Sequence, residues 1–250
     1  MRVVVAVKQI KLLGDEVEFT ADGRDVDPDY LDRGLNEWDA CATEEALRIR
    51  ERLGGDGEVV VVTVGDAESE AVLRRCLAMG ADRAIRVDAE PVDPISTARA
   101  LAAVVAGEAP DLVLTGVQSA DSVQGSTGIA LAELLGLPRV AVVTRLEWDG
   151  AGAATVHREL EGGLVDVVEV DTPALLTIQT GINEPRYATL RAIKQAEQHE
   201  IAVVPADGGE PSYRIRRMFP PSRGEGAEML NGSPAAVAQR IVELVKERLA

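Results

Sequence analysis

The segment from Thr115 to Gly128 carries the residues best suited to hold a ligand. It leaves the carboxyl end of a predicted strand and enters a predicted helix. Its glycines let the backbone approach a ligand, and Ser126 and Thr127 add hydroxyl groups. A helix that starts here offers free N–H groups and the positive end of its dipole. These features suit a phosphate, although an ordinary loop with a capping Ser or Thr has the same composition.

Other kinds of active site have little support in the sequence. The two histidines, His157 and His199, have no Cys or His nearby at the spacing of metal ligands. Cys41 and Cys76 lie in predicted helices and form no C-x-x-C motif, so we expect reduced thiols without redox chemistry. The sequence contains neither a Walker A motif nor a Gly-x-Gly-x-x-Gly motif after a strand. We therefore expect no catalytic residues and no metal site.

Alternating strands and helices position the candidate loop. Strands are predicted at Arg2–Val7, Glu58–Val64, Arg83–Val87, Leu112–Thr115, Val140–Glu147 and Ala174–Gln179. Helices are predicted to run from Asn36 to Leu53, Asp66 to Met79, Pro94 to Ala106, Gly128 to Leu135 and Thr189 to Gln198. This alternation predicts an α/β fold with a mainly parallel sheet and helices on both faces. The loops at Lys8-Gln9 and Gly65-Asp66 should then meet the candidate loop at one sheet edge.

Several segments depart from the alternating pattern. The stretch Leu12–Pro28 reads as irregular, with a small hairpin around Asp22-Gly23, and a second, antiparallel hairpin is predicted around Gly162-Gly163. The stretch Val204–Pro234 is rich in Pro and Gly and reads as an arm. We expect a nucleotide-binding α/β domain at 1–203, and a C-terminal arm with a terminal amphipathic helix at 204–250. The apolar stripe of that helix packs either on the core or on a partner.

Composition excludes several classes of function. A formal net charge of −16 argues against coating nucleic acid and against docking on an anionic membrane surface. The hydrophobic content of 46% is enough for a substantial core, and no apolar run is long enough to span a membrane. The first strand is too short for a signal sequence and has no cleavage site. We expect a cytoplasmic protein without membrane insertion.

Two further segments each permit two interpretations. Asn36 precedes a helix, and its amide can cap the backbone or read an adenine edge, of which capping is the simpler role. The segment Gly181–Lys194 contains an Asn-Glu-Pro turn before a helix start. Within it, Leu190 and Ile193 fit the core stripe of a helix as well as an exposed binding surface.

Along almost its whole length the sequence resembles the beta subunits of the electron transfer flavoproteins. The resemblance rests on six segments in the same order, of which the last is the most specific. They are Val5–Gln9, Leu35–Asp39, Cys76–Arg83, Asp111–Gly116 with the Gln118–Gly128 loop, Arg158–Gly163 and Asn183–Leu190.

The resemblance implies a Rossmann-like fold of the adenine nucleotide alpha hydrolase type in one half of an alpha–beta heterodimer. Such a dimer carries one FAD, held largely by the alpha subunit, which takes electrons from flavin dehydrogenases and passes them to an acceptor. The beta subunit is an electron carrier component and not an enzyme, and its own pocket binds AMP in a structural role. The positions that match the AMP pocket are Ala6, Asn36, Glu37, Trp38, Asp39, Val64, Gln118, Ser122, Val123, Gln124, Gly125, Ser126, Thr127, Gly128 and Ile129.

The same resemblance assigns two surfaces to partners. Thr189, Leu190, Arg191 and Ile193 match the segment that docks into a dehydrogenase of the methylated-amine or acyl-CoA class, with Leu190 as the anchor. The C-terminal arm and helix match the part that wraps around the alpha subunit. Two features depart from the family pattern. Arg191 stands where proline is frequent, and Leu12-Leu13 stand where an aromatic residue often approaches the flavin.

Three alternatives remain open. The first is an electron-bifurcating relative with a second FAD in the AMP pocket. The second is a universal-stress-type nucleotide-binding module, which would be a homodimer without a flavoprotein partner. The third, an ATP-pyrophosphate-cleaving enzyme, requires a Ser-Gly-Gly-x-Asp-Ser loop after the first strand. The sequence there is Lys8-Gln9-Ile10, so this alternative ranks last.

Overall fold

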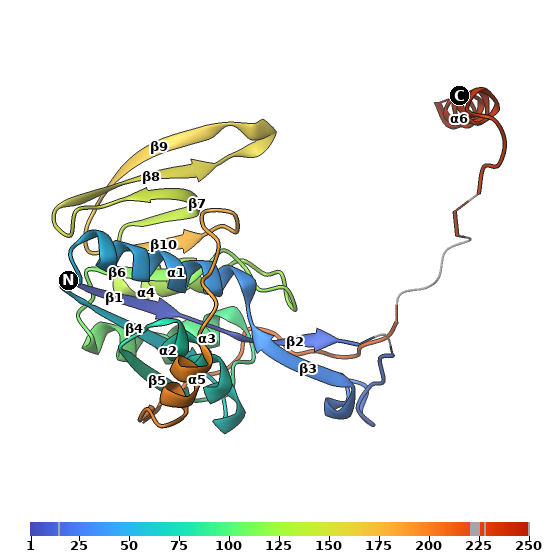
Figure 1. Ribbon diagram of the computed structural model, residues 1–250. Helices are drawn as coiled ribbons and strands as arrows, with labels where there is room; N and C mark the ends of the chain where they lie inside the picture. Colours follow the sequence, from blue (N-terminus) through green and yellow to red (C-terminus); the bar gives the residue numbers. More distant parts are fainter. Residues whose placement is uncertain (15, 221–225, 228, 250) are drawn as a thin grey trace.

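A nine-stranded sheet organises the chain in the computed structural model (Figure 1). The structure describes residues 1–14, 16–220, 226–227 and 229–249. The strand order is β11-β5-β4-β1-β6-β10-β7-β8-β9, parallel from β11 to β7 and antiparallel from β7 to β9. The strands are β1 (Arg2–Ala6), β4 (Glu58–Val64), β5 (Arg83–Asp88), β6 (Leu112–Gly116), β7 (Arg139–Glu147), β8 (Ala153–Glu159), β9 (Val165–Asp171), β10 (Ala174–Ile178) and β11 (Ala202–Pro205). The predicted mainly parallel α/β fold with an antiparallel hairpin is confirmed.

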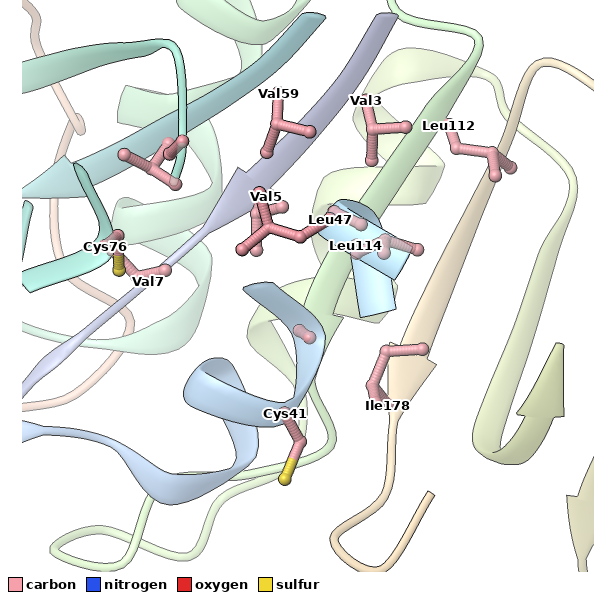
Figure 2. Close-up of a cluster of buried hydrophobic side chains, with 14 of the residues drawn as sticks. Val3, Val5, Val7, Cys41, Leu47, Val59, Cys76, Leu112, Leu114 and Ile178 are labelled. Carbon is pink, nitrogen blue, oxygen red and sulfur yellow. The ribbon is translucent and has the colours of Figure 1, made fainter. Parts of the chain in front are cut away.

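Helices cover both faces of the sheet because its strands are apolar on both sides. The helices α1 (Glu37–Arg52), α2 (Glu70–Met79) and α5 (Leu190–Glu197) cover one face, while α3 (Pro94–Gly107) and α4 (Thr127–Leu135) cover the other. Alternation along β1 sends Val3 and Val5 to the α1 side and Val4 to the opposite side. The buried side chains on each face form one hydrophobic cluster. Figure 2 shows Val3, Val5 and Leu47 of α1 in the cluster on the α1 side.

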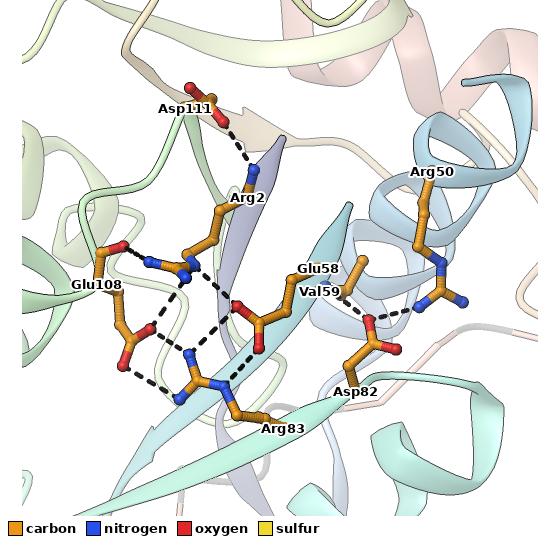
Figure 3. A network of polar contacts seen from close by, with 8 residues as sticks. All are labelled: Arg2, Arg50, Glu58, Val59, Asp82, Arg83, Glu108 and Asp111. Carbon is orange, nitrogen blue, oxygen red and sulfur yellow. Dashed lines mark hydrogen bonds and ion pairs between the residues drawn. The ribbon is translucent and has the colours of Figure 1, made fainter. Parts of the chain in front are cut away.

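The amino ends of three neighbouring strands are joined by ion pairs (Figure 3). Glu58 of β4 pairs with Arg2 of β1 at 2.8 Å and with Arg83 of β5 at 2.6 Å. Glu108, which follows α3, also pairs with Arg83. The hydrogen bond from Arg83 lowers the pKa of the Glu58 carboxyl. These partly exposed pairs add modest stability, and they lie at the end of the sheet opposite the predicted site.

A two-stranded antiparallel ribbon projects from the sheet (Figure 1). It pairs β2 (Gln9–Leu13) with β3 (Leu31–Leu35), so the expectation of an irregular chain from Leu12 onward is wrong at its start. The ribbon gave no periodic signal because it has few buried side chains, among them Ile10 and Leu35. Its tip carries the predicted small hairpin, in which Phe19 bridges Val26.

The C-terminal part of the chain leaves the sheet through β11. This strand pairs with β5 and straddles the expected domain boundary between residues 203 and 204. The helix α6 (Pro234–Leu249) has no buried residue and lies apart from the sheet in Figure 1. Positions 221–225, 228 and 250 of the predicted arm and helix lie outside the described residues. Among the described helices, none combines the length and the hydropathy that crossing a membrane requires.

Candidate functional site

A cavity of about 260 Å³ opens at the carboxyl edge of the sheet. It lies where β1, β4 and β6 end and where α3 and α4 begin. Of the two loops predicted to meet the candidate loop here, Lys8 lines the cavity, whereas Gly65-Asp66 does not and only the preceding Val64 does. Most of the residues predicted to bind the cofactor line this cavity. They are Ala6, Asn36, Asp39, Val64, Gln118, Ser122, Gln124, Gly125, Ser126, Thr127 and Gly128.

Four predicted cofactor residues do not line the cavity. Trp38 turns towards β10, where its Nε1 donates a hydrogen bond to Gln179 Oε1 at 2.8 Å. Val123 sits at the tip of the loop with 61% of its side chain exposed. Glu37 and Ile129 belong to the first turns of α1 and α4. The structure therefore brings the loop residues together around the cavity and leaves these four beside it.

Asp39 fixes the ends of two neighbouring strands beneath the cavity. Its carboxylate is buried and accepts hydrogen bonds from the backbone N–H of Lys8, after β1, and of Gly116, at the end of β6. The two donor–acceptor distances are 2.8 and 2.9 Å. Burial raises the pKa of the carboxyl to about 7 in spite of these bonds. Asp39 is thus a structural anchor that ties the ends of β1 and β6 together at the cavity.

Asn36 links the start of α1 to the candidate loop. Its Nδ2 donates to the Gln118 carbonyl at 2.8 Å, and its Oδ1 accepts from the Ala120 N–H at 3.3 Å. It makes no side-chain capping bond, so the predicted capping role is wrong for the side chain. Both ends of the amide contact the loop, and the side chain also hydrogen-bonds the Asp39 carboxyl, so its role is tertiary and not that of a backbone cap.

The loop before α4 leaves the helix start open to a ligand. Ser126 occupies the N-cap position, but its side chain makes no capping hydrogen bond. Gly128, in the first turn, lies so close to β6 that an added Cβ atom would stand 2.5 Å from Thr115 Oγ1. Backbone N–H groups and hydroxyls are therefore the donors that this end of the cavity offers to an anion.

One lysine lies at the mouth of the cavity, and it is already paired. Lys8 Nζ lies 2.5 Å from Asp121 Oδ1 and 3.1 Å from Ser119 Oγ. Although burial opposes the effect, the hydrogen bonds from Lys8 and Ser119 lower the pKa of the Asp121 carboxyl. Among the described lining residues, Lys8 is the only Lys or Arg. The cavity thus favours a ligand of small negative charge over a polyphosphate.

Two walls of the cavity were not predicted. One comes from the start of α3 and the loop before it; the other comes from Tyr213 and Ile215 of the arm. The α3 wall could have been predicted from the sequence, because β5 is parallel to β4 and the chain after it must emerge at the same edge of the sheet. No sequence feature placed the arm at the cavity, since its Pro- and Gly-rich composition indicates a loose tail. The α3 wall consists of Pro91, Val92, Asp93, Pro94, Thr97 and Leu101.

A second cavity, of about 420 Å³, lies between α1 and the end of β7. It contains none of the residues predicted to bind a cofactor. Its arginines are ion-paired: Arg48 with Glu44, Arg52 with Glu45, and Arg145 with Glu147. Trp148, which also lines this groove, has a buried Nε1 without a hydrogen-bond partner. Because the residues predicted to bind the cofactor gather at the other cavity, we place the candidate site at the carboxyl edge.

The predicted docking segment stands on a firmly held loop. Arg186 pairs with Glu44 at 2.7 Å and with Glu51 at 2.6 Å, which ties the loop to α1. Leu190 begins α5 and is 80% exposed, so it is not a core residue of this chain. Ile193 and Arg191 are exposed, and the Thr189 hydroxyl caps the helix by accepting from the Ala192 N–H at 3.2 Å.

A mainly parallel sheet with a cavity at its carboxyl edge defines a doubly wound α/β protein. The family described as "Electron transfer flavoprotein domain" matches residues 26–208. The chain is 45% identical to "Electron transfer flavoprotein subunit beta" of Methylophilus methylotrophus, over 99% of this chain and 98% of that protein. It is 34% identical to the protein of the same name from Syntrophomonas wolfei (98% and 96% covered) and 35% identical to that of Homo sapiens (84% and 83% covered). The chain therefore belongs to the electron transfer flavoprotein family, among its beta subunits.

Proposed function

We propose that this chain is one half of a heterodimeric electron carrier and pairs with an electron transfer flavoprotein alpha subunit. The pair holds one FAD, bound largely by the alpha subunit, takes electrons from a flavin dehydrogenase and passes them to an acceptor. The chain itself makes and breaks no bonds, because the flavin supplies the redox chemistry and the protein supplies position. The observation that carries this proposal is the end-to-end match to proteins named as beta subunits.

We infer that the carboxyl-edge cavity binds AMP. Its volume of about 260 Å³ lies below the usual range for ligand pockets of about 300–1,000 Å³, which favours a mononucleotide over a dinucleotide such as FAD. The uncapped start of α4 provides backbone N–H groups for the phosphate, with the hydroxyls of Ser126 and Thr127 beside them. Ala6 and Val64, at the ends of β1 and β4, provide apolar surface for the base.

The terminal helix is our candidate for the alpha-subunit contact. Its apolar residues Ile241, Val242 and Val245 are each about half exposed, and α6 buries no residue. An amphipathic helix gains stability by burying its apolar stripe against another surface. The described part of this chain offers it no such surface, so a partner subunit is the occupant that we propose.

The exposed start of α5 is our candidate for dehydrogenase docking. A transient electron-transfer contact needs a small interface with a protruding apolar anchor. Leu190 meets this requirement, and Tyr187, which is 94% exposed, lies three residues before it in the sequence. We propose a dehydrogenase of the methylated-amine or acyl-CoA class as the partner.

Coexpression with an alpha subunit tests the proposed function. We expect a one-to-one pair that purifies with the yellow absorption of a single flavin. A colourless homodimer of this chain would instead favour the universal-stress-type module. Two flavins per pair would favour an electron-bifurcating protein with FAD in the cavity. Either result would contradict the proposal.

A further inference from the structure

Residues 206–219, called here the crossing segment, run across the mouth of the candidate cavity after β11. The segment is held first at α3, where Arg99 Nη1 donates to the Glu210 carbonyl at 3.3 Å. It is held last near the ribbon, where the Met218 N–H donates to the Gly23 carbonyl at 2.7 Å. Between these attachments lie Tyr213 and Ile215, which line the cavity, so the segment passes across it.

Asp93 fastens the crossing segment at the near side of the cavity. Its Oδ1 caps α3 by accepting from the N–H groups of Ile95 and Ser96, both at 2.8 Å. Its Oδ2 accepts from the backbone N–H and from the hydroxyl of Ser212, the latter at 3.0 Å. Asp93 is only 3% exposed, and its carboxylate occupies the positive end of α3, so this helix start is closed to an anionic ligand.

Tyr213 and Ile215 follow immediately and form part of the cavity wall. The Tyr213 hydroxyl accepts a hydrogen bond from Gln124 Nε2, in the loop that leads into α4. The segment is thus fastened to the α3 side through Ser212 and to the α4 side through Tyr213. A ligand whose phosphate sits at α4 would lie beneath this bridge.

We propose that Tyr213 and Ile215 form a latch that retains the nucleotide, so that the nucleotide leaves only when the crossing segment detaches. This inference rests on the proposed function, since it requires an adenine nucleotide in the cavity. It adds two binding residues that lie far along the chain from the loop at Gln118–Gly128. The side chains are about half exposed, as expected for a cover at the mouth and not for core residues.

The rate of nucleotide exchange tests the latch. The purified pair with the alpha subunit is incubated with radiolabelled AMP, and the exchange of bound for labelled nucleotide is followed. The double variant Tyr213→Ala with Ile215→Ala should exchange about tenfold faster or more, from the lost hydrogen bond and the lost apolar cover. Its midpoint of thermal unfolding in the presence of saturating AMP should stay near that of the wild type. Tyr213→Phe keeps the cover and removes the hydroxyl, so its rate should be intermediate.

Phe219→Ala is the matched control, because this residue is in the same segment but does not line the cavity. It should exchange nucleotide like the wild type. Equal exchange rates in the wild type and the double variant would overturn the latch and leave the AMP site standing. A wild-type pair that neither contains nor takes up AMP would overturn the latch together with the proposed AMP site.

Discussion

Replacing Gly128 with alanine perturbs the nucleotide site at a point where the steric cost can be worked out. The added Cβ atom would stand 2.5 Å from Thr115 Oγ1 and 2.9 Å from Thr177 Cγ2. The first contact is about 0.9 Å inside the ordinary contact distance of 3.4 Å. Both threonines are buried, and Thr177 Oγ1 is held by the N–H of Val142 at 3.1 Å. We therefore expect the first turn of α4 to move away from β6.

The movement should weaken AMP binding more than it weakens folding. Overpacking costs about 1–3 kcal/mol, and alanine recovers about 1 kcal/mol of helix propensity, which leaves a small net loss of stability. Each N–H bond lost to a charged phosphate costs about 1.5–3 kcal/mol, or roughly a tenfold to hundredfold loss of affinity.

Calorimetric titration with AMP and urea unfolding measure the two effects of Gly128→Ala separately. The control is Gly107→Ala, at the end of α3, where no atom lies within 4 Å of the added Cβ. This control should leave the affinity almost unchanged and, since it gains helix propensity without a clash, should raise the stability by up to about 1 kcal/mol. An AMP affinity of Gly128→Ala equal to that of the wild type would refute the placement of the phosphate at α4.

Three further predictions concern the other surfaces. Leu190→Ala should lower the rate of electron transfer from the dehydrogenase about tenfold or more at unchanged stability, as measured by stopped-flow reduction of the flavin. Leu134→Ala, which changes an exposed leucine on α4, should leave this rate unchanged. A loss of melting temperature that matches the loss of rate would instead make Leu190 a structural residue. Burial would raise the pKa of Asp93, but hydrogen bonds from Ser96 and Ser212 lower it from 3.8 to about 2. The ionised carboxylate therefore stabilises the fold at pH values above its ordinary pKa. The difference in free energy of urea unfolding between the wild type and Asp93→Asn should shrink as the pH falls from about 5 to about 2. A difference that does not change with pH would contradict this role of Asp93. Ile241→Asp in α6 should raise the dissociation constant of the subunit pair roughly tenfold or more, while Glu243→Gln should leave it unchanged. A dissociation constant of Ile241→Asp equal to that of the wild type would show that α6 is not part of the interface.

Local sequence signals were sufficient for the elements of the sheet domain. The apolar run Glu58–Val64 became β4 with the expected limits, because it is bounded by polar and glycine residues. Gly80 and Gly136 end α2 and α4 with positive φ angles, as expected for glycine after a helix. The convergence of loops on one edge followed from the parallel topology alone.

Long-range contacts explain what sequence reasoning missed. Asn36 reaches Gln118, a partner 82 residues away, and no local pattern distinguishes that role from capping. The wall formed by Tyr213 depends on where the crossing segment runs, which its composition does not specify. The ribbon of β2 and β3 is stabilised by backbone pairing between exposed strands, so it has no apolar alternation to detect.

The nucleotide content of the purified pair tests the central claim most directly. Denaturing the complex and measuring the released small molecules by mass spectrometry gives the ratio of AMP to FAD. The cavity volume and the open start of α4 predict one AMP for each pair of subunits, beside the one FAD that we propose the alpha subunit largely holds. Two FAD molecules without AMP, or one FAD with no second adenine nucleotide, would contradict the assignment of the carboxyl-edge cavity.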